Sequence, residues 1–261
     1  MQIRPLGKTG LVVSALGLGT VKLGRNTGIK YPGGNGFALP TDEQAAELLR
    51  TAAECGITLI DTAPAYGTSE ERIGALMAAN RWFGGRDRWI VCSKAGEEFD
   101  AATTTSRFDF SPAAIRASID RSLRRLRIDT VDIVLLHSDG RDEWIIRDSG
   151  ALEALGDAQR SGKVRAIGIS TKTITGGLLA IEHCDVVMVT LNTANTGELP
   201  VIDAAKKRGV GVLIKKALAG GHATEPRMAI AYAAETAGVS SVIVGSANPN
   251  NILINASALA R

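Results

Sequence analysis

The sequence predicts an α/β fold, a closed (β/α)8 TIM barrel in which eight parallel strands each lead into a helix. Its 261 residues suit one such barrel. Strand-like and helix-like segments alternate along the chain, and the strands are continuous apolar runs that indicate burial on both faces of a parallel sheet. A doubly wound open sheet is the alternative, but its early glycine-rich turn usually opens a helix. Here residues 17–20 lead into a loop rich in Gly and Asn rather than into a helix.

The first half of the chain supplies four strand–helix units. Thr41 and Gln44 form a capping box that opens the first helix, and Gly56 closes it. Ser111 is an N-cap with Pro112 in the first turn, and apolar residues then follow at helical spacing. A polar loop, 95–110, precedes that helix. The predicted strands are 14–19, 57–60, 89–93 and 131–136, and the predicted helices are 41–55, 69–79, 111–126 and 149–160.

The second half continues the alternation. No segment has the composition of a linker, so residues 1–261 are predicted to form a single domain. Residues 3–13 indicate a small N-terminal β-hairpin that plugs the bottom of the barrel. The glycine-rich stretch 28–36 is read either as a flap over the site or as a flexible insertion. The predicted strands are 164–169, 185–190, 210–214 and 242–244, and the predicted helices are 174–182, 199–208, 225–237 and one from 249.

Composition and charge argue against several classes of function. The net charge of +3, with 22% charged residues, is too balanced for nucleic acid or an anionic membrane. No apolar stretch reaches about 18 residues, and the N-terminus lacks the apolar core of a signal peptide. Cys55, Cys92 and Cys184 lack metal-site spacing and are interpreted as buried thiols. We therefore expect a cytoplasmic protein without a metal, and without nucleic-acid or membrane partners.

Four side chains with chemical potential lie at or just past three successive strands. Asp61 follows the strand 57–60, and Tyr66 lies on the loop after it. Lys94 follows the next strand and His137 the one after that. In parallel α/β folds, the carboxyl ends of the strands meet at one face, where the active sites lie. The four side chains are therefore predicted to converge there.

The order of these motifs resembles that of the aldo-keto reductases along nearly the whole chain. Further motifs that carry the resemblance are 17–20 (Gly-Leu-Gly-Thr), Ser69-Glu70, 162–170 and 242–245. The resemblance implies a (β/α)8 barrel that binds NADP(H) in an extended pose without a Rossmann fold. It also implies that Asp61, Tyr66, Lys94 and His137 are a catalytic tetrad.

The chemistry of these residue types fits carbonyl reduction, which needs a hydride on carbon and a proton on oxygen. Tyr66 is the candidate general acid, and the ammonium of Lys94 would stabilise its phenolate. Asp61 would hold Lys94 in place, and His137 would orient the substrate oxygen. Taken singly, each residue also has a structural interpretation, as a cap, a surface aromatic or a solvated strand end.

The resemblance also implies cofactor contacts. Ser170 matches the serine that binds the nicotinamide carboxamide, whereas Thr171 and Met188 replace the usual Asn and Gln. Residues 214–221 replace the usual Tyr-Ser-Pro-Leu segment, and strand alternation lets one of Lys215 and Lys216 reach the pyrophosphate or the 2′-phosphate; the alternative is that both are solvated at the barrel rim. In the adenosine-phosphate segment, the last helix presents its N-terminus to the phosphate. The predicted cofactor contacts are Gly19, Thr20, Asp61, Ser170, Thr171, Met188, Lys215, Lys216, Gly245, Ser246, Asn251 and Asn255.

These expectations combine into an NADP(H)-dependent reductase of aldehydes or ketones, with NAD(H) as the alternative cofactor. The substrate contacts are predicted to be Tyr66, His137 and Trp144, and the partner is a small carbonyl or alcohol. A monomer is expected, with a homo-oligomer as the alternative. The competing functions are an aldose or alcohol dehydrogenase working in the oxidative direction, a nicotinamide-sensing barrel without catalysis, and a degenerate barrel with a structural role.

Overall fold

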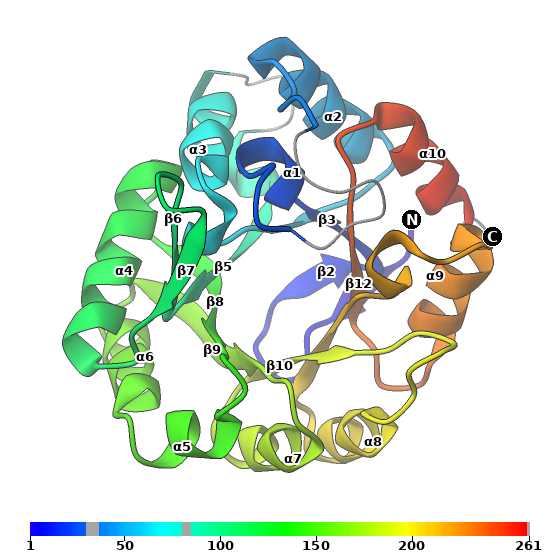
Figure 1. The fold of residues 1–261 in the computed structure, drawn as a ribbon. Helices are drawn as coiled ribbons and strands as arrows, with labels where there is room; N and C mark the ends of the chain where they lie inside the picture. Colours follow the sequence, from blue (N-terminus) through cyan, green and yellow to red (C-terminus); the bar gives the residue numbers. More distant parts are fainter. Residues whose placement is uncertain (30–36, 80–84, 260–261) are drawn as a thin grey trace.

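The computed structural model describes residues 1–29, 37–79 and 85–259. Eight parallel strands close into a barrel in the order β10-β11-β12-β3-β4-β5-β8-β9, and Figure 1 shows helices forming an outer ring around it. The predicted α/β barrel is therefore confirmed. Residues 30–36 of the predicted flap lie outside the described residues. The barrel strands are β3 (Leu16–Gly19), β4 (Leu59–Asp61), β5 (Ile90–Ala95), β8 (Val131–His137), β9 (Val164–Ser170), β10 (Val186–Thr190), β11 (Gly211–Lys215) and β12 (Ser241–Gly245).

Each barrel strand is followed by a helix of at least nine residues, as the alternating pattern predicts. The capping box of α2 is formed, with Thr41 and the Gln44 side chain each bonding the other residue's backbone N–H. Ser111 caps α4 as predicted. Among the described residues, no helix combines the length and apolarity needed to cross a bilayer. The helices are α2 (Asp42–Glu54), α3 (Ser69–Ala79), α4 (Pro112–Leu126), α6 (Ala151–Arg160), α7 (Ile174–His183), α8 (Leu199–Arg208), α9 (Pro226–Glu235) and α10 (Pro249–Ser257).

Strand alternation divides the apolar core into two layers. One set of side chains points outward and packs under the helices, among them Ile60, Val134 and Leu136. The other set fills the barrel interior, among them Leu59 and Ile133. Successive strand residues point to opposite faces, so continuous apolar strands are required to fill both layers. Of the three cysteines, Cys92 and Cys184 are buried, whereas Cys55 caps the end of α2 and is only half-buried.

The predicted N-terminal hairpin is present and closes one end of the barrel. β1 (Ile3–Pro5) pairs antiparallel with β2 (Val12–Ser14). Leu6, Leu11 and Val13 belong to the interior apolar cluster of the barrel. The backbone N–H of Lys8 donates to the Gly209 carbonyl, just before β11 begins. The hairpin therefore seals the amino ends of the strands and leaves the carboxyl ends to form the site.

Three elements differ from the sequence-based expectations. The predicted loop 95–110 contains a two-stranded hairpin, β6 (Glu97–Asp100) and β7 (Thr105–Phe108). A short helix, α5 (Asp142–Arg147), follows β8. A single helical turn, α1 (Val21–Gly24), follows β3 where none was expected. All three lie at the carboxyl end of the barrel, where Figure 1 shows α1 and the β6–β7 hairpin near the mouth.

Candidate active site

The predicted catalytic residues come from three neighbouring strands of the barrel. β4, β5 and β8 are adjacent, and their register places Asp61 beside Cys92 and Lys94 beside Leu135. Asp61 ends β4, and Tyr66 ends the 3-10 turn η1 (Pro64–Tyr66) that follows it. His137 ends β8. The carboxyl ends of these strands thus bring all four side chains to one hollow, as the sequence predicts.

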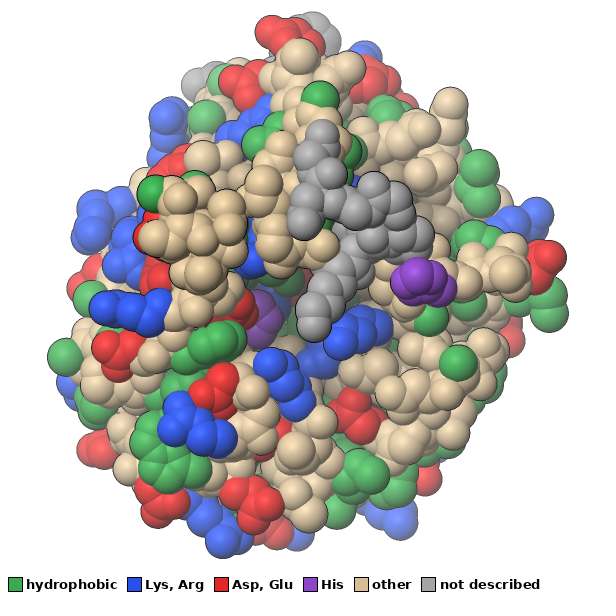
Figure 2. Space-filling view, viewed as in Figure 1, with side chains coloured by type: hydrophobic (Ala, Val, Ile, Leu, Met, Phe, Trp, Pro, Cys, Tyr) green, Lys and Arg blue, Asp and Glu red, His purple; other side chains and the backbone are tan. Residues whose placement is uncertain are grey.

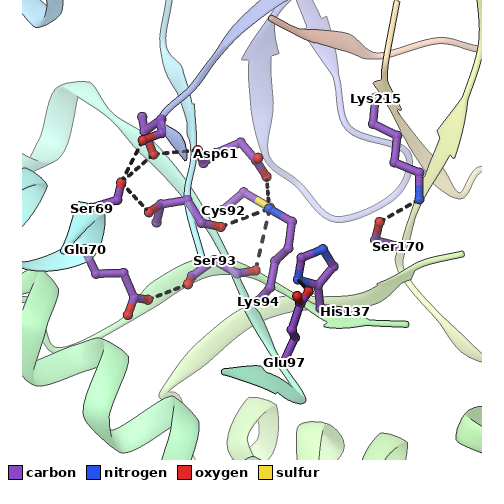
Figure 3. Close-up of polar contacts among 12 residues, drawn as sticks. Asp61, Ser69, Glu70, Cys92, Ser93, Lys94, Glu97, His137, Ser170 and Lys215 are labelled. Atoms are coloured by element: carbon purple, nitrogen blue, oxygen red, sulfur yellow. Dashed lines mark hydrogen bonds and ion pairs between the residues drawn. The ribbon is translucent and has the colours of Figure 1, made fainter. Parts of the chain in front are cut away.

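Lys94 lies at the centre of this group. Its Nζ donates to Asp61 Oδ1 at 2.6 Å and to the Thr62 carbonyl at 2.9 Å, as Figure 3 shows. The same Nζ is 4.8 Å from the centroid of the Tyr66 ring. Burial alone would lower the pKa of Lys94, but Asp61 and Tyr66 outweigh burial, and the net pKa is raised above its ordinary value. Lys94 is therefore an ammonium at neutral pH.

His137 contacts both Tyr66 and a carboxylate that the sequence did not reveal. The Tyr66 and His137 rings meet edge to face, with centroids 6.4 Å apart. His137 Nδ1 is 2.8 Å from Glu97 Oε2, although the ring N–H is not aligned for a hydrogen bond. Burial lowers the pKa of His137, and Glu97 opposes that shift. Burial acts to raise the pKa of Glu97, but the nearby His137 ring, the Ser106 side chain and Arg25 lower it to about 2.

A chain of hydroxyl groups fixes the loop ends behind Asp61. Thr20 Oγ1 donates to the Asp61 carbonyl at 2.9 Å. Ser69 Oγ lies 2.8 Å from Thr20 Oγ1 and accepts from Thr62 Oγ1 at 3.0 Å. These bonds join the ends of β3 and β4 to the start of α3. Because Thr20, Thr62 and Ser69 are fully buried, the position of Asp61 is set by packed, hydrogen-bonded neighbours rather than by solvent.

The hollow at the carboxyl end of the barrel has a volume of about 560 Å³. It extends from the ends of β3 and β12 to the four candidate catalytic residues. Gly19 and Gly245 face each other at its rim, and a Cβ on Gly19 would lie 3.3 Å from the Gly245 nitrogen. Lys22, which the sequence analysis did not single out, also lines it. Of the predicted cofactor contacts, the hollow is lined by Gly19, Thr20, Asp61, Ser170, Met188, Lys215, Lys216 and Gly245.

The remaining predicted contacts lie elsewhere. Thr171 lines a second, adjoining hollow. Ser246 bonds the backbone of Asn248 in the turn before α10, and Asn255 is buried on α10. Asn251 is exposed on the same helix. Trp144, the predicted substrate contact, packs edge to face on Phe110 and lines neither hollow.

Both lysines at the end of β11 reach the site, although strand alternation predicts that only one does. Lys215 ends the strand, and its Nζ donates to Ser170 Oγ at 2.9 Å and to the Thr171 carbonyl. Lys216 lies beyond the strand in a left-handed conformation, with φ +57°. The left-handed backbone at Lys216 interrupts the strand alternation that would send its side chain to the opposite face. Both lysine side chains therefore line the two hollows.

Comparison with known proteins gives a consistent family. Residues 15–227 match the model of the Aldo/keto reductase family. The chain is 32% identical to L-galactose dehydrogenase of Arabidopsis thaliana over 236 residues, which is 86% of this chain and 68% of that protein. It is 31% identical to the NADH-specific methylglyoxal reductase of Escherichia coli, over 63% of this chain and 50% of that protein.

The solved structures agree with the sequence comparison. An aldo-keto reductase from Pseudomonas aeruginosa superimposes with a TM-score of 0.87 and 44% identity, covering 99% of this chain and 95% of that one. The chain thus spans nearly all of this structural neighbour. It spans only about half to two thirds of the length of the two sequence relatives above. The substrates in the names of those two proteins therefore do not assign a substrate to this chain.

Proposed function

The chain belongs to the aldo-keto reductase family, and from this premise we propose that it reduces aldehydes or ketones to alcohols with NADP(H). The family uses nicotinamide cofactors. Because the relatives are named as dehydrogenases and reductases, the protein is an oxidoreductase. The observation that carries the finer proposal is the buried Asp61–Lys94 ion pair, whose ammonium lies 4.8 Å from the Tyr66 ring centroid.

Each of the four residues has a separate task in this proposal. Tyr66 gives its hydroxyl proton to the substrate oxygen. Lys94 stabilises the phenolate that remains, because a cation close to the ring favours the ionised form. Asp61 keeps the ammonium charged and in position. His137 donates to the substrate oxygen and aligns it with Tyr66.

The residues that line the hollow support a nicotinamide dinucleotide as its ligand. Such a cofactor, when bound, supplies the hydride. Gly19 and Gly245 leave the rim without side chains, so a flat, extended molecule can approach the backbone closely. Lys22, Lys215 and Lys216 supply positive charge for phosphates, and Ser170 supplies a hydroxyl for an amide. We propose NADP(H) as the cofactor and the cytoplasm as the location; binding of NADPH and NADH measured side by side tests the cofactor.

The direction of the reaction has a second candidate. The relative from Arabidopsis thaliana is named a dehydrogenase, as is the D-threo-aldose 1-dehydrogenase of a Pseudomonas species that is 30% identical over 200 residues. Oxidation of an aldose or another alcohol uses the same residues, because the phenolate of Tyr66 then accepts the proton. Rates measured in both directions with the same substrate pair distinguish the two candidates.

Replacing the proposed acid is the direct test. Tyr66→Phe is expected to reduce NADPH oxidation with 4-nitrobenzaldehyde by about 10²–10⁴-fold, the usual contribution of general acid catalysis. The affinity for NADPH, measured by fluorescence, should stay close to that of the wild type. Tyr232→Phe is the matched control, because Tyr232 lies on α9, is 36% exposed and lines neither this hollow nor the adjoining one. An active Tyr66→Phe protein would refute the acid assignment, and a wild type that binds NADPH without turnover would favour the sensing barrel.

A further inference from the structure

A second hollow of about 790 Å³ adjoins the first at His137. His137, Ser170, Lys215 and Lys216 line both hollows. The second extends from them over the ends of β9 and β10 towards α8. Its lining contains no residue of β3 or β12, which border the first hollow. The part of the second hollow beyond these shared residues is therefore separate from the part of the first that lies at the ends of β3 and β12.

The lining of the second hollow contains three lysines and several neutral polar side chains. The three lysines are Lys172, Lys215 and Lys216. Of these, Lys172 lines the second hollow but not the first. Figure 2 shows basic side chains gathered around the centre of this face of the barrel. The neutral polar groups beside them include Thr190, Asn192 and Asn195, which can bond hydroxyl groups.

The carboxylates near these lysines offset only part of the positive charge: Glu198 and Asp142 interact with Lys215, and Asp139 interacts with Lys172. Asp142 is buried and accepts from the backbone N–H groups of Lys172 and Thr173 and from the Thr173 hydroxyl. Glu198, which lines the hollow, accepts from the Thr190 N–H, and burial raises the pKa of Glu198. These hydrogen bonds orient both acids towards the surrounding backbone, and in the lining of the hollow three lysines outnumber one carboxylate, Glu198.

We propose that this second hollow binds the carboxylate or phosphate of an acidic substrate whose carbonyl group lies between Tyr66 and His137. The inference rests on the proposed function and names its substrate class: a hydroxylated aldehyde or ketone that carries an anionic oxygen group. Lys172, which lines only this hollow, holds the anion, and Lys215 and Lys216, which line both hollows, add positive charge on the side shared with the first.

The position of the hollow separates this role from binding of the cofactor phosphates. Lys22 lines only the first hollow and Lys172 only the second, so each lysine reports on one of them. If the lysines of the second hollow served the cofactor instead, loss of Lys172 would weaken NADPH binding. Under the proposal, loss of Lys172 changes the preference among substrates and loss of Lys22 does not.

Protonation of Lys215 is linked to anion binding. Burial lowers the pKa of Lys215 to about 8; Lys216 and Lys172 act in the same direction, and Glu198 and Asp142 oppose them. A bound anion favours the ammonium form, so binding raises this pKa and takes up protons above pH 8. Affinity for an acidic ligand is therefore greatest below pH 8 and falls as the pH rises through that value.

A matched pair of aldehydes tests the proposal. Wild-type protein should show a higher kcat/KM for 4-carboxybenzaldehyde than for 4-nitrobenzaldehyde, which has a similar shape without the charge. Lys172→Gln should lower this ratio by about fivefold and Lys172→Glu by about tenfold or more, since the lysine is exposed and partly screened. Lys22→Gln should leave the ratio unchanged. A ratio that does not respond to Lys172→Glu would overturn the inference.

Two further measurements separate the sources of failure. The ratio for glyceraldehyde 3-phosphate over glyceraldehyde, in the same variants, tells whether phosphate or carboxylate is preferred, and no preference for either acid refutes the proposal. Calorimetric binding of the two benzaldehydes to wild type and Lys172→Glu does not need turnover. Tighter binding of the acid to wild type supports the second hollow even if the proposed reductase activity is absent. Equal binding of the two aldehydes counts against it.

Discussion

The residues that the sequence could identify are those whose positions follow from strand ends. Asp61, Lys94 and His137 follow apolar runs, so their convergence needs only a parallel barrel. Glu97 could not be found in this way, because it belongs to a hairpin that extends from β5. Lys216 reaches the site through one left-handed residue, and strand alternation carries no information about that.

Glu97 offers a test of how His137 is charged. The carboxylate stabilises the imidazolium, which carries a proton on both ring nitrogens and can donate to substrate. Since Glu97 opposes the lowering of the His137 pKa, Glu97→Gln lets that pKa fall further. In the pH range below 6.5 where His137 of the wild type is protonated, we expect kcat to fall by up to about tenfold, the effect of losing one charge-assisted contact. The alkaline loss of activity should also begin at lower pH.

The neighbouring carboxylate provides the control for this prediction. Glu98 bonds Ser118 and Arg121 on α4, away from the hollow. Glu98→Gln should therefore keep the wild-type pH profile of kcat. Identical profiles for Glu97→Gln and Glu98→Gln would show that Glu97 does not set the charge of His137.

The lowered pKa of Glu97 also makes the stability of the fold depend on pH. Because this pKa is about 2 against an ordinary 4.5, the contacts of the Glu97 carboxylate stabilise the fold above pH 4.5. That contribution is lost as the pH falls from 4.5 towards 2.

At the scale of elements, the sequence predicted the eight strand–helix units but not the β6–β7 hairpin. Helix caps and apolar periodicity act locally, so Thr41 and Ser111 were read correctly. The strands of the hairpin are half-buried and mixed in polarity, and the segment that joins them lacks Gly, Asn and Pro. The hairpin is held by tertiary contacts instead: Arg25 lies 3.7 Å from the ring centroid of Phe99, and Glu98 pairs with α4.

The turn of this hairpin contains a residue whose backbone conformation is unfavourable for its type. Thr104 precedes β7 with φ +54°, a region that β-branched residues rarely occupy. Thr104→Gly should remove about 1 kcal/mol of steric cost, partly offset by the greater freedom of glycine in the unfolded chain. We expect a net gain of about 0.5 kcal/mol in the free energy of unfolding, measured in urea. Ala101→Gly, where φ is not positive, should be slightly destabilising; a loss at position 104 would contradict the assignment of strain.

At the scale of the whole molecule, the barrel divides its residues between two ends. The carboxyl ends of the strands hold the candidate catalytic residues, whereas the amino ends are closed by apolar residues of the N-terminal hairpin. The sequence predicted this division because a (β/α)8 barrel has it in general. The single-domain organisation over 1–261 remains a prediction, which one cooperative unfolding transition would support.

This division predicts that stability and catalysis can be changed separately. Leu6 is fully buried in the barrel interior, so Leu6→Ala should lower the free energy of unfolding by about 3 kcal/mol. Val12 lies on the same hairpin but is 57% exposed, and Val12→Ala should cost less than about 0.5 kcal/mol. Because the hairpin packs at the end opposite to Tyr66, both folded variants should keep the wild-type kcat at 20 °C. Equal destabilisation by the two changes would mean that the hairpin does not seal the barrel, and a selective loss of kcat in Leu6→Ala would mean that the two ends are coupled.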